Sequence, residues 1–112
     1  MSFEIITSDY FDTEAKALAK RYKSFKKDLI EFRKELEKAP LQGSEIAPNI
    51  RKIRMAIATK GRGKSGGARI ITYNALVTEQ EGKVYLLLIY DKADASSVKM
   101  NVVKQLVKEL IG

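Results

Sequence analysis

The chain has 112 residues, 45% of them apolar and 31% charged, and we expect a single domain over residues 1–112 with one modest core. It contains no cysteine and no histidine, which excludes a disulfide framework, a thiolate nucleophile and the commonest general base and metal ligand. Any catalysis must therefore use carboxylates, tyrosines, lysines and arginines, and we expect no cofactor and no metal. No apolar run approaches the roughly 18 to 20 residues of a membrane span. The opening MSFEIITSDY lacks the charged-then-apolar order of a signal peptide, so a cytoplasmic protein without membrane contact is expected.

The net charge of +7 is concentrated in one third of the sequence. Residues 46–78 contain no acidic side chain, and the remaining 14 basic residues of the chain are balanced by 14 acidic ones. Such a concentration of positive charge is typical of a polyanion-binding surface, and nucleic acid is the expected polyanion. A merely solvated charged face is the alternative. The seven basic residues are Arg51, Lys52, Arg54, Lys60, Arg62, Lys64 and Arg69.

The first half of the chain predicts a strand followed by two amphipathic helices. Residues 3–7 alternate as a short strand that ends at the turn-forming Ser8 and Asp9. Asp12 is the expected cap of a first helix, and Ser24 caps a second that Pro40 stops. A helical hairpin packed on a sheet is therefore expected. The apolar faces consist of Ala15, Leu18, Ala19 and Tyr22 in the first helix and Phe25, Leu29, Phe32 and Leu36 in the second.

The second half predicts three strands and a last helix. A breaker-rich loop spans residues 40–48, after which Ile53, Met55 and Ile57 alternate with basic residues along a strand that has one apolar face. Residues 68–77 and 84–90 are the next two strands, joined by a turn at 79–82, and the latter is apolar on both faces and hence central. Asp94 or Ser96 caps the final helix. The predicted class is α+β, with the order β-α-α-β-β-β-α and a small, mostly antiparallel sheet.

The segment ATKGRGKSGGARI contains two overlapping phosphate-loop patterns. Gly61, Gly63 and Gly66 fit G-x-G-x-x-G, and residues 63–65 form the G-K-S end of a Walker A loop whose first glycine is replaced by Ala58. A phosphate loop needs a helix after it, because the free N–H groups of the helix receive the anion. Here the glycines lead into the β-rich ARIITY, so we reject nucleotide binding and expect a long flexible hairpin tip that carries cations.

Four stretches together resemble one known family. The basic strand IRKIRMA, the loop GRGKSGG, the strand ARIITY and the run YLLLIYDK are similar to the RelE/ParE toxin superfamily, most of all to the HigB and RelE-like toxins of type II toxin–antitoxin modules. The resemblance implies a RelE-like fold and a ribosome-dependent endoribonuclease that cleaves mRNA and inhibits translation. It also implies a cognate antitoxin, either a helix-turn-helix or an acidic protein, that forms a complex such as a heterotetramer with the toxin.

The resemblance also implies roles for particular residues. Arg69 matches the arginine that contacts the scissile phosphate, and its planar fork suits that contact. Lys64 and Lys60 resemble the basic residues that transfer protons or stabilise charge. Lys92 matches a second basic position of the family, and Tyr90 joins the predicted catalytic set. RNA cleavage needs little more than this, because a 2'-hydroxyl attacks the adjacent phosphate when the backbone is oriented and the developing charge is stabilised. The predicted RNA-binding residues are Lys52, Arg54, Lys60, Arg62 and Tyr73.

Two alternatives stay open at this point. The superfamily includes ParE-type proteins, which inhibit DNA gyrase and are not nucleases, and a fold does not choose between the two activities. A non-catalytic nucleic-acid-binding module is the third hypothesis. For both Tyr73 and Tyr90, a position in the core is at least as well supported by the sequence as a role in stacking or proton transfer.

Overall fold

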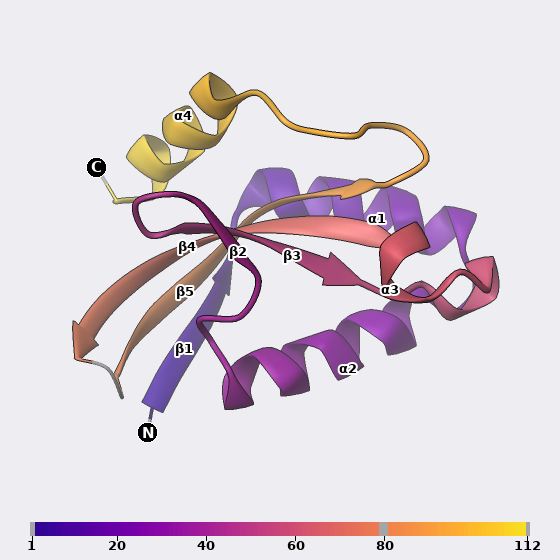
Figure 1. The fold of residues 1–112 in the computed structure, drawn as a ribbon, viewed down its shortest axis with the longest axis horizontal. Helices are drawn as coiled ribbons and strands as arrows, with labels where there is room; N and C mark the ends of the chain where they lie inside the picture. The colour runs from indigo at the N-terminus through magenta and orange to yellow at the C-terminus, as the bar shows by residue number, and fades with distance from the viewer. Residues whose placement is uncertain (1, 79–80, 112) are drawn as a thin grey trace.

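The computed structural model describes residues 2–78 and 81–111, which form one mixed sheet with helices on both of its faces (Figure 1). The elements in chain order are β1 (Ser2–Thr7), α1 (Asp9–Arg21), α2 (Phe25–Lys38), β2 (Ser44–Ala47), β3 (Ile50–Met55), the 3-10 turn η1 (Ala58–Lys60), the single turn α3 (Gly63–Gly66), β4 (Ala68–Thr78), β5 (Glu81–Asp91) and α4 (Met100–Ile111). The predicted α+β class and the helical hairpin are confirmed at this level.

The sheet has the strand order β1-β5-β4-β3-β2. β1 pairs with β5 in parallel, and the other three pairings are antiparallel. β5 lies between β1 and β4, and from Val84 to Asp91 all of its residues are buried except the partly buried Tyr85 and Tyr90, as its two apolar faces predicted. Arg54 near the end of β3 pairs with Arg69 near the start of β4, and Arg69 pairs with Tyr90 near the end of β5. Because directly opposed residues point to the same face, these three side chains start from one face of the sheet.

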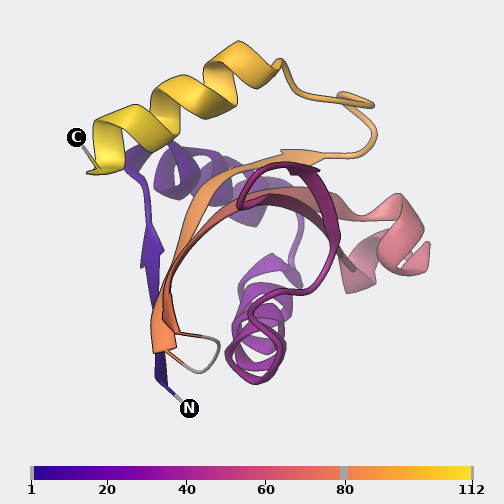
Figure 2. The same cartoon turned by 60° about the vertical axis from the view of Figure 1, so that its left-hand side comes forward.

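Each face of the sheet is covered by its own layer of helix (Figure 2). On one face, α1 and α2 bury Phe11, Leu18, Phe25, Phe32 and Leu36 against β3, β4 and β5. On the other face, α4 places Val103 and Leu106 over a second cluster that contains Ile50, Ile71 and Leu88. α4 is too short to cover the whole of this face, and the basic ends of β3 and β4 extend past it (Figure 1).

The predicted starts of the first and last helices were wrong, whereas α2 begins directly after Ser24 as predicted. α1 begins at Asp9, because the hydroxyl oxygen of Ser8 accepts a hydrogen bond from the Phe11 N–H at 2.9 Å and thereby caps the helix before Asp12. Ser24 stands before α2 but makes no cap to its backbone; its hydroxyl instead joins the side chain of Asp28 and the Thr59 N–H. α4 begins only at Met100, so neither Asp94 nor Ser96 caps it.

Two predicted loops contain regular structure. Within the loop expected at 40–48, residues 44–47 form the edge strand β2. The sequence did not reveal it, because its first three residues are exposed and show no alternation of burial. The flexible tip expected at 58–67 is instead folded into η1 and α3. Of the turn predicted at 79–82, residues 79–80 lie outside the described residues, while Glu81 and Gly82 belong to β5.

No helix among residues 2–78 and 81–111 has the length and apolar character needed to cross a membrane.

Candidate nucleic-acid interface

A cationic pocket of about 650 Å³ lies beside the end of β3 and the start of β4. Among its lining residues are five cations and no carboxylate. The cations come from β3, from α3, from the start of β4 and from the residue after β5, so segments distant in the sequence converge here. A concave surface with charge of a single sign concentrates its field and attracts anions. The five residues, hereafter the cationic pocket, are Lys52, Arg54, Lys64, Arg69 and Lys92.

The basic face of β3 forms one wall of this pocket. Ile53 and Met55 are buried against α1 and α2, so the alternation of the strand turns Lys52 and Arg54 to the opposite face. The Lys52 ammonium donates to the carbonyl oxygen of Ser96 at 3.4 Å, which connects β3 with the segment between β5 and α4. Arg54 is exposed, and its guanidinium has no ion pair among the described residues.

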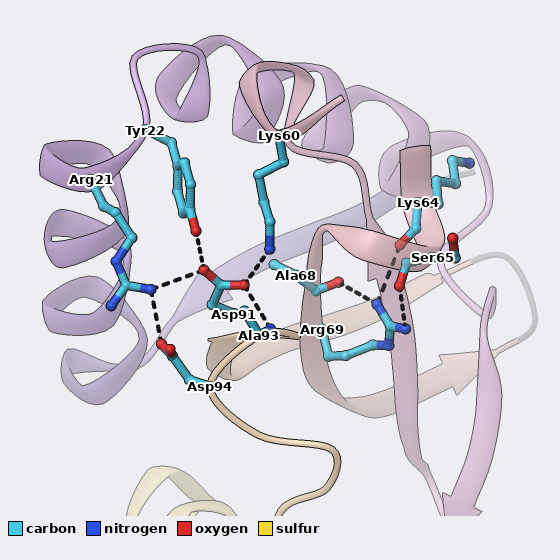
Figure 3. Close-up of polar contacts among 10 residues, drawn as sticks. All are labelled: Arg21, Tyr22, Lys60, Lys64, Ser65, Ala68, Arg69, Asp91, Ala93 and Asp94. Atoms are coloured by element: carbon cyan, nitrogen blue, oxygen red, sulfur yellow. Dashed lines mark hydrogen bonds and ion pairs between the residues drawn. The ribbon is translucent and has the colours of Figure 1, made fainter. Parts of the chain in front are cut away.

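Arg69 lies at the base of the pocket and is only 6% exposed. Its guanidinium donates to the carbonyl oxygens of Lys64 (3.3 Å), Ser65 (3.0 Å) and Ala68 (3.2 Å), as Figure 3 shows. The bonds to Lys64 and Ser65 satisfy carbonyls that the single helical turn α3 leaves open. None of the described partners of Arg69 is a carboxylate, so its positive charge is not neutralised by the protein. Three of the five N–H groups of a guanidinium account for these bonds, and the others can serve an anion in the pocket.

Lys64 and Lys92 are exposed cations that line the pocket together with Arg69. The Lys64 ammonium lies 3.7 Å from a carboxylate oxygen of Glu35, and both side chains are more than half exposed, so this pair is weak and easily exchanged. The backbone N–H of Lys92 donates to the carbonyl oxygen of Gly67 at 3.0 Å. Gly67 must be glycine, because a Cβ atom there would stand 2.0 Å from the carbonyl oxygen of Met55. The hydrogen bond to Gly67 places the backbone of Lys92 next to the start of β4.

The structure brings five of the nine predicted site residues together and leaves four outside. Lys60 points away from the pocket and forms a salt bridge with Asp91, so we no longer count it among the RNA contacts. Arg62 is exposed on the loop but does not line the pocket. Tyr73 and Tyr90 pack against the cluster under α4, and the buried Tyr90 hydroxyl has no hydrogen-bond partner among the described residues. The alternative that placed both tyrosines in the core therefore describes their positions.

Sequence reasoning missed a buried polar centre on the other side of Lys92, built around Asp91 (Figure 3). The Asp91 carboxylate is 1% exposed and accepts hydrogen bonds from the Lys60 ammonium (2.5 Å), the Arg21 guanidinium (2.9 Å), the Tyr22 hydroxyl and the Ala93 N–H (2.9 Å). Arg21 also pairs with the exposed Asp94 at 2.9 Å. The one sequence signal for this centre was a carboxylate directly after a fully apolar strand.

The ionisation of Asp91 follows from these contacts. Burial raises the pKa of this carboxyl, but the hydrogen bonds from Lys60, Tyr22, the Ala93 backbone and Arg21 outweigh burial and hold its pKa well below the ordinary value. The hydrogen bonds to Asp94, Tyr22 and Asp91 raise the pKa of Arg21 above its already high value. Asp91 is thus a carboxylate, and its charge is compensated locally by Lys60 and Arg21.

No group of three or more carboxylates among residues 2–78 and 81–111 is arranged to hold a metal ion. The chain matches no protein-family model.

Proposed function

We propose that this protein is the toxin of a type II toxin–antitoxin module and acts as a ribosome-dependent endoribonuclease on mRNA. The observation that carries the proposal is the cationic pocket, in which five cations surround an open hollow of about 650 Å³ without a lining carboxylate. A pocket of this kind suits the sugar-phosphate backbone, because phosphate contacts from lysine and arginine dominate nucleic-acid affinity. The resemblance of the stretches quoted above to this family is the second support for the proposal.

The chemistry we propose uses the 2'-hydroxyl of the RNA as the nucleophile. The hydroxyl oxygen attacks the adjacent phosphorus, the bond to the 5' oxygen breaks, and the products are a 2',3'-cyclic phosphate and a new 5' hydroxyl. Arg69 at the base of the pocket would hold the non-bridging oxygens, where charge grows in the transition state. The proton of the 2'-hydroxyl would pass to water, and Lys64 or Lys92 would donate a proton to the leaving 5' oxygen and recover one from water, while both ammonium groups stabilise the developing charge. Tyr90 has no part in this scheme, since its hydroxyl is buried under α4.

The proposed partners are mRNA in the ribosome and an antitoxin that covers the cationic pocket, in the cytoplasm of a bacterium. The antitoxin would be a helix-turn-helix or acidic protein, and a toxin–antitoxin heterotetramer is the assembly we propose. An acidic surface would neutralise these cations, because no carboxylate lines the pocket.

The test is inducible expression in a bacterium, with primer extension along several abundant messages before and after induction. New 5' ends within translated codons are the expected result. Lys92→Gln should reduce these cuts at least tenfold, whereas Lys16→Gln, which removes an equal charge from an exposed position on α1, should leave them unchanged. Arg69→Ala is a poorer probe, because it also removes the bonds that hold α3.

Two other outcomes would overturn the nuclease. Growth arrest with DNA damage and intact messages would indicate a ParE-like inhibitor of gyrase. Absence of arrest, together with RNA binding that weakens steeply with salt, would indicate a non-catalytic binding module.

A further inference from the structure

We propose that Asp91 is a positioning residue that fixes the two sides of the cationic pocket relative to each other without itself contacting RNA. This inference rests on the proposed function for its consequence in catalysis, but its structural part can be tested separately. Asp91 does not line the pocket; it lies at the end of β5, directly before Lys92.

One side of the pocket depends on Asp91 through the turn after β5. One carboxylate oxygen of Asp91 accepts the Ala93 N–H at 2.9 Å, and the Asp91 carbonyl oxygen accepts the Asp94 N–H at 3.0 Å. These two bonds close a tight turn around Lys92, whose own N–H is bound to Gly67. The backbone of Lys92 is thus held on both sides, which limits the directions its side chain can take from the turn.

The other side depends on Asp91 through Lys60. The same carboxylate oxygen that accepts the Ala93 N–H accepts the Lys60 ammonium at 2.5 Å. Lys60 ends η1, and four residues later the chain reaches Lys64 of the pocket. Asp28 and Ser24 bind the N–H groups of Ala58 and Thr59, so they tie the start of η1 to α2. Lys60 is the side chain that ties η1 to β5.

A single oxygen therefore joins the segment that carries Lys64 to the turn that carries Lys92 (Figure 3). The buried position of Asp91 favours this role, because an almost fully enclosed ion pair is not exchanged for water as an exposed pair is. Catalysis is sensitive to such placement, since a shift of about 1 Å in a catalytic group can cost on the order of 100-fold in rate.

The experiment compares Asp91→Asn with the matched control Asp94→Asn. Both changes remove one negative charge from the same turn and one partner of Arg21, but Asp94 contacts neither Lys60 nor the Ala93 N–H. For Asp91→Asn we expect faster hydrogen exchange by at least tenfold in both residues 58–64 and 92–95. We also expect cleavage of mRNA on ribosomes to slow by at least tenfold, while the Kd for a single-stranded RNA stays the same or falls, because the protein gains net positive charge. The control should change neither exchange nor cleavage.

A second variant, Lys60→Met, removes only the link to η1 and keeps the turn. We expect faster exchange in residues 58–64 alone, slower cleavage, and an unchanged slope of log Kd against log salt concentration. A slope reduced by about 1 would mean that Lys60 contacts a phosphate directly, which would overturn its assignment as a link.

The outcomes separate this inference from the proposed function. Unchanged exchange in both segments of Asp91→Asn would overturn the positioning role whatever the cleavage result. Loss of cleavage and of RNA binding together would likewise overturn it, because that pattern marks general unfolding. A wild-type protein that cuts no mRNA would overturn the proposed function, while the exchange data would still decide whether Asp91 organises the pocket.

Discussion

Replacing Asp91 with asparagine removes a charge from the most enclosed ionic contact of the described structure. The side chains of Asp91 and Lys60 are 0% and 10% exposed, and their charged atoms lie 2.5 Å apart. The variant leaves the Lys60 ammonium buried without its counter-ion, a situation that typically costs about 3–5 kcal/mol of folding free energy. Arg21 is half exposed and can be hydrated, so its lost partner adds little. We therefore expect the free energy of unfolding at pH 7 to fall by about 3–5 kcal/mol.

The pH dependence of this loss has a defined sign. The pKa of Asp91 is lower in the folded protein than in the unfolded chain, so its ionisation stabilises the fold above the unfolded pKa of about 3.9. That contribution is lost as the pH falls from there towards the folded pKa. The difference between wild type and Asp91→Asn should therefore be constant above pH 5 and shrink by about 1.4 kcal/mol for each pH unit below 3.9.

Urea unfolding followed by circular dichroism at pH 7, 5 and 3 measures both quantities. Asp94→Asn is the control, because its carboxylate is 56% exposed and its loss should cost about 1 kcal/mol or less. In the double variant with Lys60→Met, part of the loss should be recovered, since no unpaired ammonium remains. A loss below 1 kcal/mol at pH 7, or a loss of equal size at pH 7 and pH 3, would refute this account of the ion pair.

Three further predictions concern the pocket and its supports. Arg69→Lys should lower stability by about 1–3 kcal/mol, because an ammonium cannot reproduce the bonds to the carbonyls of α3, and chemical denaturation would measure the loss. Gly67→Ala should cost at least about 1–3 kcal/mol, because its Cβ would stand 2.0 Å from a backbone oxygen, whereas Gly61→Asn, at φ 69° with open space around it, should shift the melting temperature little. Lys92→Gln should weaken binding to any single-stranded RNA and reduce the salt slope by about 1; an unchanged slope would show that Lys92 contacts no phosphate.

The long periodic elements could be predicted because their pattern of burial repeats along the chain. The faces of α1 and α2 and the alternation of β3 follow directly from such repeats. β2 could not be found in this way, since its first three residues are exposed and the strand is paired only with β3. The turns at 58–66 are held by hydrogen bonds from other segments, including those of Asp28 and Arg69, and no local sequence pattern predicts such bonds.

The cationic pocket was predictable in part. Arg54, Lys64 and Arg69 belong to the basic third of the sequence, and Lys92 was selected through the family resemblance. Lys60 belongs to the same basic third, so the sequence predicted that it binds RNA as well. Residue type and spacing do not reveal which side of a loop a lysine faces. Tyr73 and Tyr90 do not line the pocket, because their side chains pack against the second cluster, to which α4 contributes.

By itself, the sequence determined the α+β class, the amphipathic helices and the excess of positive charge in residues 46–78, because each depends on composition or on a repeat along the chain. Only the tertiary structure decided which cations share a pocket, and that Lys60 is instead paired with the buried carboxylate of Asp91. The reason is that Asp91 and Lys60 are 31 residues apart, and their pairing depends on the packing of η1, α1 and β5 around one enclosed site. The ammonium of Lys92 lines the pocket and would attract RNA, whereas the ammonium of Lys60 stabilises the fold through its ion pair with Asp91.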